Sequence, residues 1–185
     1  MKPVAFLMYG SESRHQDRIG ELSKYLSGIG CDVTTVPGGT NSSKTLWLLW
    51  KVVRSIRPDQ LLLLVYNGHG LRGKWETGIS YTHLAFVLRW LKGNLMIVND
   101  TCYGFHLLHV IRKFRSADTT GFISAWDSDD VSYGGPLRDI LRFWPQGKRV
   151  EDEVSGQIYS SEDGDIEVPV QIRWGTQYDY HFFPD

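Results

Sequence analysis

The chain has 185 residues, of which 42% are hydrophobic and 22% charged, a composition typical of one globular domain rather than a disordered chain. Its formal net charge of −1 lacks the basic excess of a nucleic-acid-binding domain. Two cysteines, Cys31 and Cys102, are too few for a disulfide framework and are typical of a reducing compartment. The apolar stretches are too short to span a bilayer. We therefore expect a single cytoplasmic domain over residues 1–185, with neither a membrane nor a nucleic acid as partner.

Strands and helices are predicted to alternate along the first 145 residues. Apolar runs predict strands at 3–9, 31–36, 61–66, 95–99 and 120–126. Apolar residues at helical spacing predict helices at 14–29, 42–56, 82–92, 104–115 and, shorter, 136–143. This order predicts an α/β fold whose sheet is mainly parallel, with helices on both faces.

The predicted helix at 42–56 is apolar nearly all round, because Trp47 and Trp50 add to its leucine-rich face. Asn41 or Ser42 is expected to cap its first turn. Such a helix is expected to be buried within the domain, with a dimer or partner surface as the alternative. We therefore expect a monomer or a homodimer.

Residues 151–167 contain seven acidic side chains and no Lys or Arg. A block of like charges usually forms a solvated loop or hairpin, which is the expectation here. A divalent-cation site is the alternative, because hard cations prefer clustered carboxylates. Residues 168–174 then alternate as a closing strand would.

The polar residues that suggest chemistry follow two of the predicted strands. The strand at 61–66 ends in YNGHG, with His69 between two glycines, and the strand at 95–99 ends in NDTCYG, with Cys102 at its centre. Functional groups of an open α/β sheet gather at the carboxyl ends of its strands. If these strands are neighbours, His69 and Cys102 lie at the same edge.

A cysteine attacks as its thiolate, which an imidazolium or a helix N-terminus favours. His69 is expected to take the proton of Cys102 and later to protonate a leaving amine. The glycines allow a sharp turn and close approach of a substrate carbonyl. The backbone N–H groups of Gly70 and Cys102 are candidate oxyanion donors. Cys31 lacks such a context and is expected to pack in the core.

YNGHG and DTCYG together resemble the two signature blocks of the caspase-like cysteine peptidases, closest to the metacaspase and paracaspase branch. The later segment GFISAWDSDDVSYGGPLRDIL is similar to a metacaspase stretch in which a strand ends in a Ser-containing turn, here at Ser124. The resemblance covers residues 3–145 in the order of elements. It implies a three-layer sandwich with about six strands in its central sheet.

The resemblance also implies an activity, that of a cysteine endopeptidase acting on peptides or proteins. His69 and Cys102 would form the dyad, and Gly70 would contribute to the oxyanion hole. Asp100 matches the metacaspase carboxylate that selects Arg or Lys before the scissile bond. Ser124 would line the substrate site. Calcium activation stays open but is not supported by the motif, because the acidic residues that bind calcium in some metacaspases are not recognisable after Cys102. No other cofactor is expected.

Two residues near the first strand leave the specificity open. Arg14 resembles an arginine that caspases use to select acidic side chains, so a preference for Asp or Glu is an alternative. Glu12 could instead strengthen a pocket for basic side chains, together with Asp100.

Two functions of other classes also remain. Residues 70–80 leave little length for a substrate-binding loop, which favours an inactive caspase-fold scaffold as the main alternative. A metal-dependent hydrolase is a further alternative, because Cys102, His106 and His109 recur on one face of the predicted helix.

Overall fold

The structure is a computed structural model that describes residues 2–115, 119–123, 158–161 and 164–167. Within these residues the central feature is a five-stranded parallel sheet. The strand order is β2-β1-β3-β6-β7, with bounds Asp32–Val36, Val4–Tyr9, Leu61–Asn67, Asn94–Asp100 and Thr120–Ile123. The predicted α/β class with a mainly parallel sheet is confirmed.

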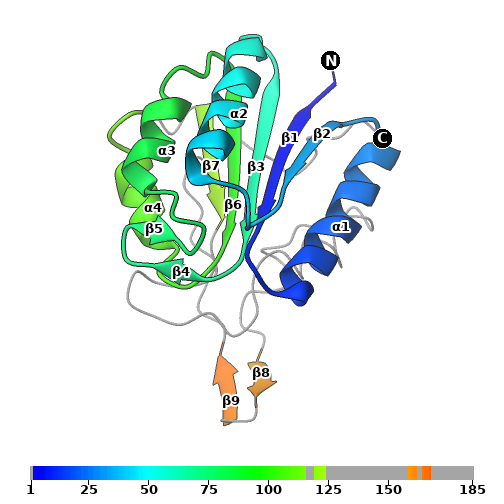
Figure 1. The fold of residues 1–185 in the computed structure, drawn as a ribbon, viewed down its shortest axis with the longest axis vertical. Helices are drawn as coiled ribbons and strands as arrows, with labels where there is room; N and C mark the ends of the chain where they lie inside the picture. The colour runs from blue at the N-terminus through cyan, green and yellow to red at the C-terminus, as the bar shows by residue number, and fades with distance from the viewer. Residues whose placement is uncertain (1, 116–118, 124–157, 162–163, 168–185) are drawn as a thin grey trace.

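Helices cover both faces of this sheet (Figure 1). They are α1, α2, α3 and α4, spanning Ser13–Gly28, Ser42–Ser55, Tyr81–Leu88 and Phe105–Ile111. Successive side chains of a strand point to opposite faces. Accordingly Leu63 of β3 belongs to the apolar cluster that includes the buried face of α1, whereas Leu62 and Leu64 belong to the cluster formed with α2, α3 and α4. The sheet is thus the middle layer of three.

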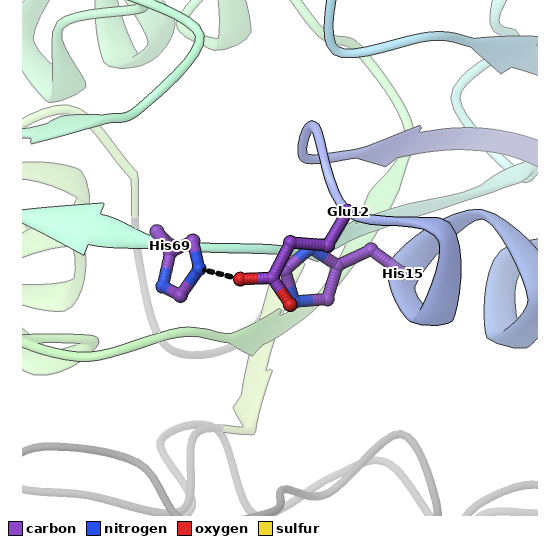
Figure 2. A group of neighbouring side chains, drawn as sticks. All are labelled: Glu12, His15 and His69. Carbon is purple, nitrogen blue, oxygen red and sulfur yellow. Dashed lines mark hydrogen bonds and ion pairs between the residues drawn. The ribbon is translucent and has the colours of Figure 1, made fainter.

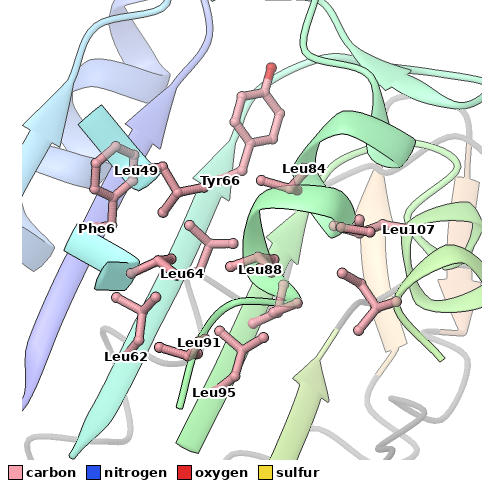
Figure 3. Packing of buried hydrophobic residues seen from close by; sticks show 14 of the residues in the cluster. Phe6, Leu49, Leu62, Leu64, Tyr66, Leu84, Leu88, Leu91, Leu95 and Leu107 are labelled. Atoms are coloured by element: carbon pink, nitrogen blue, oxygen red, sulfur yellow. The ribbon is translucent and has the colours of Figure 1, made fainter. Parts of the chain in front are cut away.

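The larger cluster is shown in Figure 3, where leucines of α2 and α3 meet those of β3 and β6. Every residue of β3 is buried, which explains why its sequence is an unbroken apolar run as far as Tyr66, before the final Asn67. Complete burial of one leucine side chain contributes about 1.5–3 kcal/mol to folding. In the strand order β3 occupies the middle of the sheet.

The direction of the strand order changes between β1 and β3. From β1 the chain passes through α1 to β2 on one side, and it then returns through α2 to β3 on the other side of β1. In open α/β sheets, ligands bind at the carboxyl ends of strands beside such a change of direction. The segments that follow β1 and β3 are therefore brought to the same place.

The helix α2 begins as predicted but is less buried than expected. The side chain of Asn41 caps it by accepting hydrogen bonds from the backbone N–H groups of Ser43 and Lys44, at 2.9 and 3.4 Å. Trp47 and Trp50, however, are 50% and 44% exposed. The expectation of a well-buried helix is wrong for these two tryptophans, because their side chains lie outside the packed face formed by Leu49 and Val53.

The two later helices end earlier than their patterns predict. Beyond α3 the N–H of Leu91 bonds to the carbonyl of Leu88, at 3.0 Å, and beyond α4 the N–H of Phe114 bonds to that of Ile111, at 2.9 Å. These i to i+3 bonds tighten the final turn and end the regular helix, although the apolar spacing continues.

Two short hairpins complete the described residues. One, formed by β4 (Gly70–Leu71) and β5 (Lys74–Trp75), was not predicted. The other, formed by β8 (Ile158–Ser161) and β9 (Gly164–Glu167), lies in the acidic stretch, where a loop or hairpin was expected. The predicted helix at 136–143 and strand at 168–174 lie outside the described residues. In the part of the chain that the structure describes, no helix has the length and apolar character to cross a membrane.

Candidate active site

The two signature segments lie side by side at one edge of the sheet. β3 and β6 are parallel neighbours, and Asn67 at the end of one is paired with Asp100 at the end of the other. The pairing continues past the strands, because the N–H of Gly68 donates to the carbonyl of Asp100 at 3.2 Å. His69 and Cys102 each follow two residues after this paired position, so the topology brings their backbones to the same edge.

Close backbone packing joins the two segments at Gly70. A Cβ atom on Gly70 would lie less than 3.0 Å from the Cys102 carbonyl oxygen and from the Thr101 hydroxyl. Only glycine allows this approach without a shift of the neighbouring chain. The two residues predicted to supply oxyanion donors, Gly70 and Cys102, are therefore in adjacent positions.

The backbone of His69 is held on both sides of its peptide unit. Its carbonyl accepts hydrogen bonds from the Tyr66 hydroxyl and from the N–H of Glu76, both at 3.0 Å. Its own N–H donates to the Glu76 carboxylate at 3.4 Å. Burial raises the pKa of Tyr66, so that hydroxyl stays protonated and available as a donor. These hydrogen bonds fix the backbone of His69, although the side chain of His69 is 47% exposed.

The imidazole of His69 is in direct contact with Glu12, as Figure 2 shows. Its Nε2 lies against Oε1 of the carboxylate, while the Arg14 Nε lies 2.5 Å from Oε2. The bond with His69 is the main reason that the pKa of Glu12 is lowered, so the carboxylate is charged at neutral pH. A carboxylate that accepts from Nε2–H leaves Nδ1 as the basic nitrogen of the ring. Glu12 was predicted to bind substrate, and its contact with the histidine was not foreseen.

His15 lies behind this pair and was also missed by the sequence analysis. It is 5% exposed, and its ring meets that of His69 edge-on, with centroids 5.3 Å apart. Its Nδ1 atom is buried and has no hydrogen-bond partner. Burial lowers the pKa of His15, which favours the neutral imidazole. The available signal was its position just after β1, beside the carboxyl end of β3.

The turn that carries Cys102 is held by a side chain of β6. Asn99 accepts a hydrogen bond from the indole N–H of Trp75 at 2.9 Å and donates to the carbonyl of Gly104 at 3.0 Å. The intervening Tyr103 has a positive φ of 55°, a conformation that side chains rarely adopt. The network therefore fixes a sharp turn directly after Cys102, which is half-buried and free of any disulfide.

Trp75 links the histidine segment to the cysteine segment. It is fully buried, stacks on Tyr66 with ring centroids 4.3 Å apart, and meets Tyr81 edge-on at 5.9 Å. Through Tyr66 it supports the His69 carbonyl, and through Asn99 it supports the turn after Cys102. The hairpin of β4 and β5 therefore connects the ends of β3 and β6 through the side chain of Trp75.

The predicted specificity residues lie in different settings. Asp100 is buried, and its carboxylate accepts a hydrogen bond from the Asn67 amide at 2.7 Å. Arg14 is largely exposed and is paired with Glu12. Ser124 lies outside the described residues, so its predicted role stays a prediction.

One group of three possible metal ligands occurs within residues 2–115 and the other described segments. It consists of Glu12, His15 and His69, whose ligand atoms all lie within 4.8 Å of one another. The predicted alternative of Cys102, His106 and His109 is not such a group.

Comparison with solved structures identifies the type of fold. No family model matches the chain, and no curated protein matches it. Among solved structures, the crystal structure of caspase-1 from Spodoptera frugiperda aligns with a TM-score of 0.67, covering 95% of this chain and 87% of that one. The chain has a caspase-like fold. The predicted caspase-like sandwich is thereby confirmed.

At 14% sequence identity, the likeness to caspase-1 shows the fold alone. The caspase-like fold does not by itself establish peptidase activity or the identity of the catalytic residues, because one fold can carry different functions. The closer resemblance to the metacaspase branch remains a prediction.

Proposed function

We propose that this protein is a cysteine endopeptidase in which Cys102 is the nucleophile and His69 the general base and acid. The observation that carries the proposal is the parallel register of β3 and β6, which sets the YNGHG and DTCYG segments side by side on a caspase-like fold. The contact between Gly70 and the Cys102 backbone supports it further, because it fits a site that is assembled from both segments.

In the proposed reaction, Nδ1 of His69 takes the proton of the Cys102 thiol. The thiolate sulfur attacks the scissile carbonyl carbon, and the resulting oxyanion is held by the backbone N–H groups of Gly70 and Cys102. The C–N bond breaks as His69 returns the proton to the leaving amine. Water, deprotonated by His69, then hydrolyses the thioester and restores the thiol. No metal or other cofactor takes part.

Glu12 has a positioning role in this proposal. Its contact with Nε2 holds the ring in one tautomer and one orientation, with Nδ1 directed away from the carboxylate. A base oriented by a third group is the general arrangement of nucleophilic catalysis. Glu12 therefore completes a triad with Cys102 and His69.

We further propose that the enzyme cleaves after Arg or Lys and belongs to the metacaspase and paracaspase branch. Asp100, two residues before the nucleophile, would supply the carboxylate for a basic side chain, which has to reach a buried group that already accepts a hydrogen bond from Asn67. The competing preference for acidic residues rests on Arg14, whose guanidinium is already paired with Glu12 in the structure. The pairing weakens that alternative. The expected partner is a peptide or protein substrate in the cytoplasm, with the enzyme a monomer or homodimer.

The test is a panel of fluorogenic peptides ending in Arg, Lys, Asp or Glu, assayed with wild type, Cys102→Ala and His69→Ala, with and without a chelator. We expect turnover of the basic peptides, lost in both variants and unaffected by the chelator. Cys31→Ala is the matched control and should keep full activity. A wild-type protein that cleaves no peptide would support the scaffold alternative, and activity that Cys102→Ala retains would refute the proposal.

A covalent probe gives a second readout. A chloromethyl ketone of a basic peptide should add to Cys102 alone, as shown by the mass of the intact protein and of its peptides. Alkylation of Cys31 in place of Cys102 would contradict the assignment of the nucleophile.

A further inference from the structure

The proposed catalysis uses Glu12 and His69, but it gives no role to His15, the third member of the cluster that these residues form. One carboxylate and two imidazoles lie with their ligand atoms within 4.8 Å of one another (Figure 2). They come from two segments, the start of α1 and the end of β3, which the strand order brings together. We propose that these three side chains bind a zinc-class divalent ion, and that the bound ion holds the peptidase inactive.

His15 gives the strongest evidence that this cluster binds a ligand. It is nine-tenths buried, and its Nδ1 has no hydrogen-bond partner, although a buried polar atom is normally paired. A histidine that serves only packing could be replaced by an apolar side chain, whereas a ligand could not.

The distances allow coordination after small side-chain movements. Tetrahedral zinc holds nitrogen and oxygen ligands at about 2.0–2.2 Å, which places the ligands about 3.4 Å from one another. The side chains of Glu12 and His69 are 38% and 47% exposed. They can therefore rotate inward, and an ion can reach them from solvent. His15 supplies the fixed inner ligand.

The ligand types select the metal. Two imidazoles and a carboxylate suit zinc and similar transition metals, whereas calcium and magnesium prefer oxygen ligands alone. The nearby charges are mixed. The Glu76 carboxylate lies within hydrogen-bond distance of the His69 N–H and adds attraction, while Arg14, paired with Glu12, opposes a cation. Arg14 is largely exposed, so solvent and salt screen its charge.

Inhibition follows from the part that His69 has in the proposed reaction, so this step rests on the proposed function. If the ion binds Nδ1 of His69, the catalytic nitrogen is blocked. If it binds Nε2, the proton of the neutral ring moves to Nδ1, which can then no longer accept one from Cys102. In both cases the dyad is inactive until the ion leaves. The sulfur of Cys102 is not needed as a ligand.

The test measures zinc binding directly, by competition between the protein and a chromophoric chelator, and uses zinc chloride as the probe. Glu12→Gln and His15→Phe should each weaken binding about tenfold or more, as loss of a group that supports a metal site commonly does. Cys102→Ala should bind as wild type does, and so should the control His109→Ala, which changes an exposed histidine outside the cluster. Arg14→Gln should bind more tightly.

Two outcomes would overturn the inference. One is zinc binding that neither Glu12→Gln nor His15→Phe changes, and the other is binding that disappears in Cys102→Ala. If the buried substitution His15→Phe prevents folding, as judged by circular dichroism, Glu12→Gln at the partly exposed position still decides. Because binding is read without substrate, a protein that lacks peptidase activity still tests the metal site. Conversely, an active peptidase that zinc neither binds nor inhibits disproves this inference alone.

Discussion

His69 and Glu12 contact each other across the ends of β3 and β1, so an imidazole from the middle of the chain is oriented by a carboxylate from its beginning. Glu12→Gln should lower kcat/KM for basic peptides by about 10²-fold, the lower end of the range typical of proton-transfer groups, because the ring loses a charged partner. The decrease should lie mainly in kcat, since Glu12 orients the base. Glu21→Gln, a change of an exposed acid on α1, is the control, and an equal loss there would contradict the assigned role.

The same contact predicts a dependence of stability on pH. The pKa of Glu12 is lowered from 4.5 in the folded protein, chiefly by the His69 bond, so this carboxylate stabilises the fold above that value and stops doing so as the pH falls through its folded pKa. The difference in urea midpoint between wild type and Glu12→Gln should therefore shrink as the pH falls below 4.5. A difference that grows on acidification would contradict the pairing.

His15 predicts an effect at higher pH. Burial lowers its pKa from 6.5, so below pH 6.5 the unfolded chain binds a proton that the folded chain does not, and stability decreases as the pH falls toward the folded pKa. His15→Phe removes this contribution. Urea unfolding from pH 7.5 to 5 should show a smaller loss of stability in the variant than in wild type. His83→Phe serves as the control, and identical curves for wild type and His15→Phe would disprove the explanation.

The packing at Gly70 predicts a variant that folds and yet fails to catalyse. A Cβ there would meet the Cys102 carbonyl, so Gly70→Ala should displace the cysteine turn and abolish turnover while leaving the apolar core intact. Gly20→Ala is a matched control, because a Cβ at that helical position meets nothing within 4 Å. It should raise stability by about 0.5–1 kcal/mol through helix propensity and keep full activity. Normal activity in Gly70→Ala would exclude the proposed oxyanion arrangement.

The hydrogen bond from Trp75 to Asn99 predicts that a change of Trp75 lowers both stability and activity. Trp75→Phe removes the indole donor and leaves the Asn99 oxygen buried without it, at a cost of about 1–3 kcal/mol. The turn after Cys102 loses one of its supports, so kcat should also decrease. Trp47→Phe, at a half-exposed position, should change neither quantity. Calorimetry would measure the stability of both variants, and peptide turnover would measure their activity. A fully active Trp75→Phe would contradict the claim that Trp75 supports the turn after Cys102.

Much of the fold could be predicted because apolar runs mark strands that are buried on both faces. The run at 61–66 became the central strand β3, and the chemistry-bearing residues after it and after 95–99 lie at one edge. The helix ends were less predictable, since the spacing of apolar residues does not show where hydrogen bonding tightens to a final turn.

The surroundings of His69 could not be predicted for a different reason. The contacts of Glu12 and His15 with it depend on β1 being the neighbour of β3, which follows from the strand order and not from local pattern. The strands of the Trp75 hairpin are only two residues long, too short to show a period. Its buried indole depends on contacts with residues distant in sequence, such as Asn99.

The interior position of β1 also affects the order in which the protein can fold during synthesis. This strand pairs with β2 on one side, but its other partner is Leu61–Asn67, which the ribosome delivers much later. Until then a nascent chain presents an apolar strand with one open edge, the kind of surface that promotes aggregation. Slow translation between α2 and β3 should therefore make this chain more dependent on chaperones.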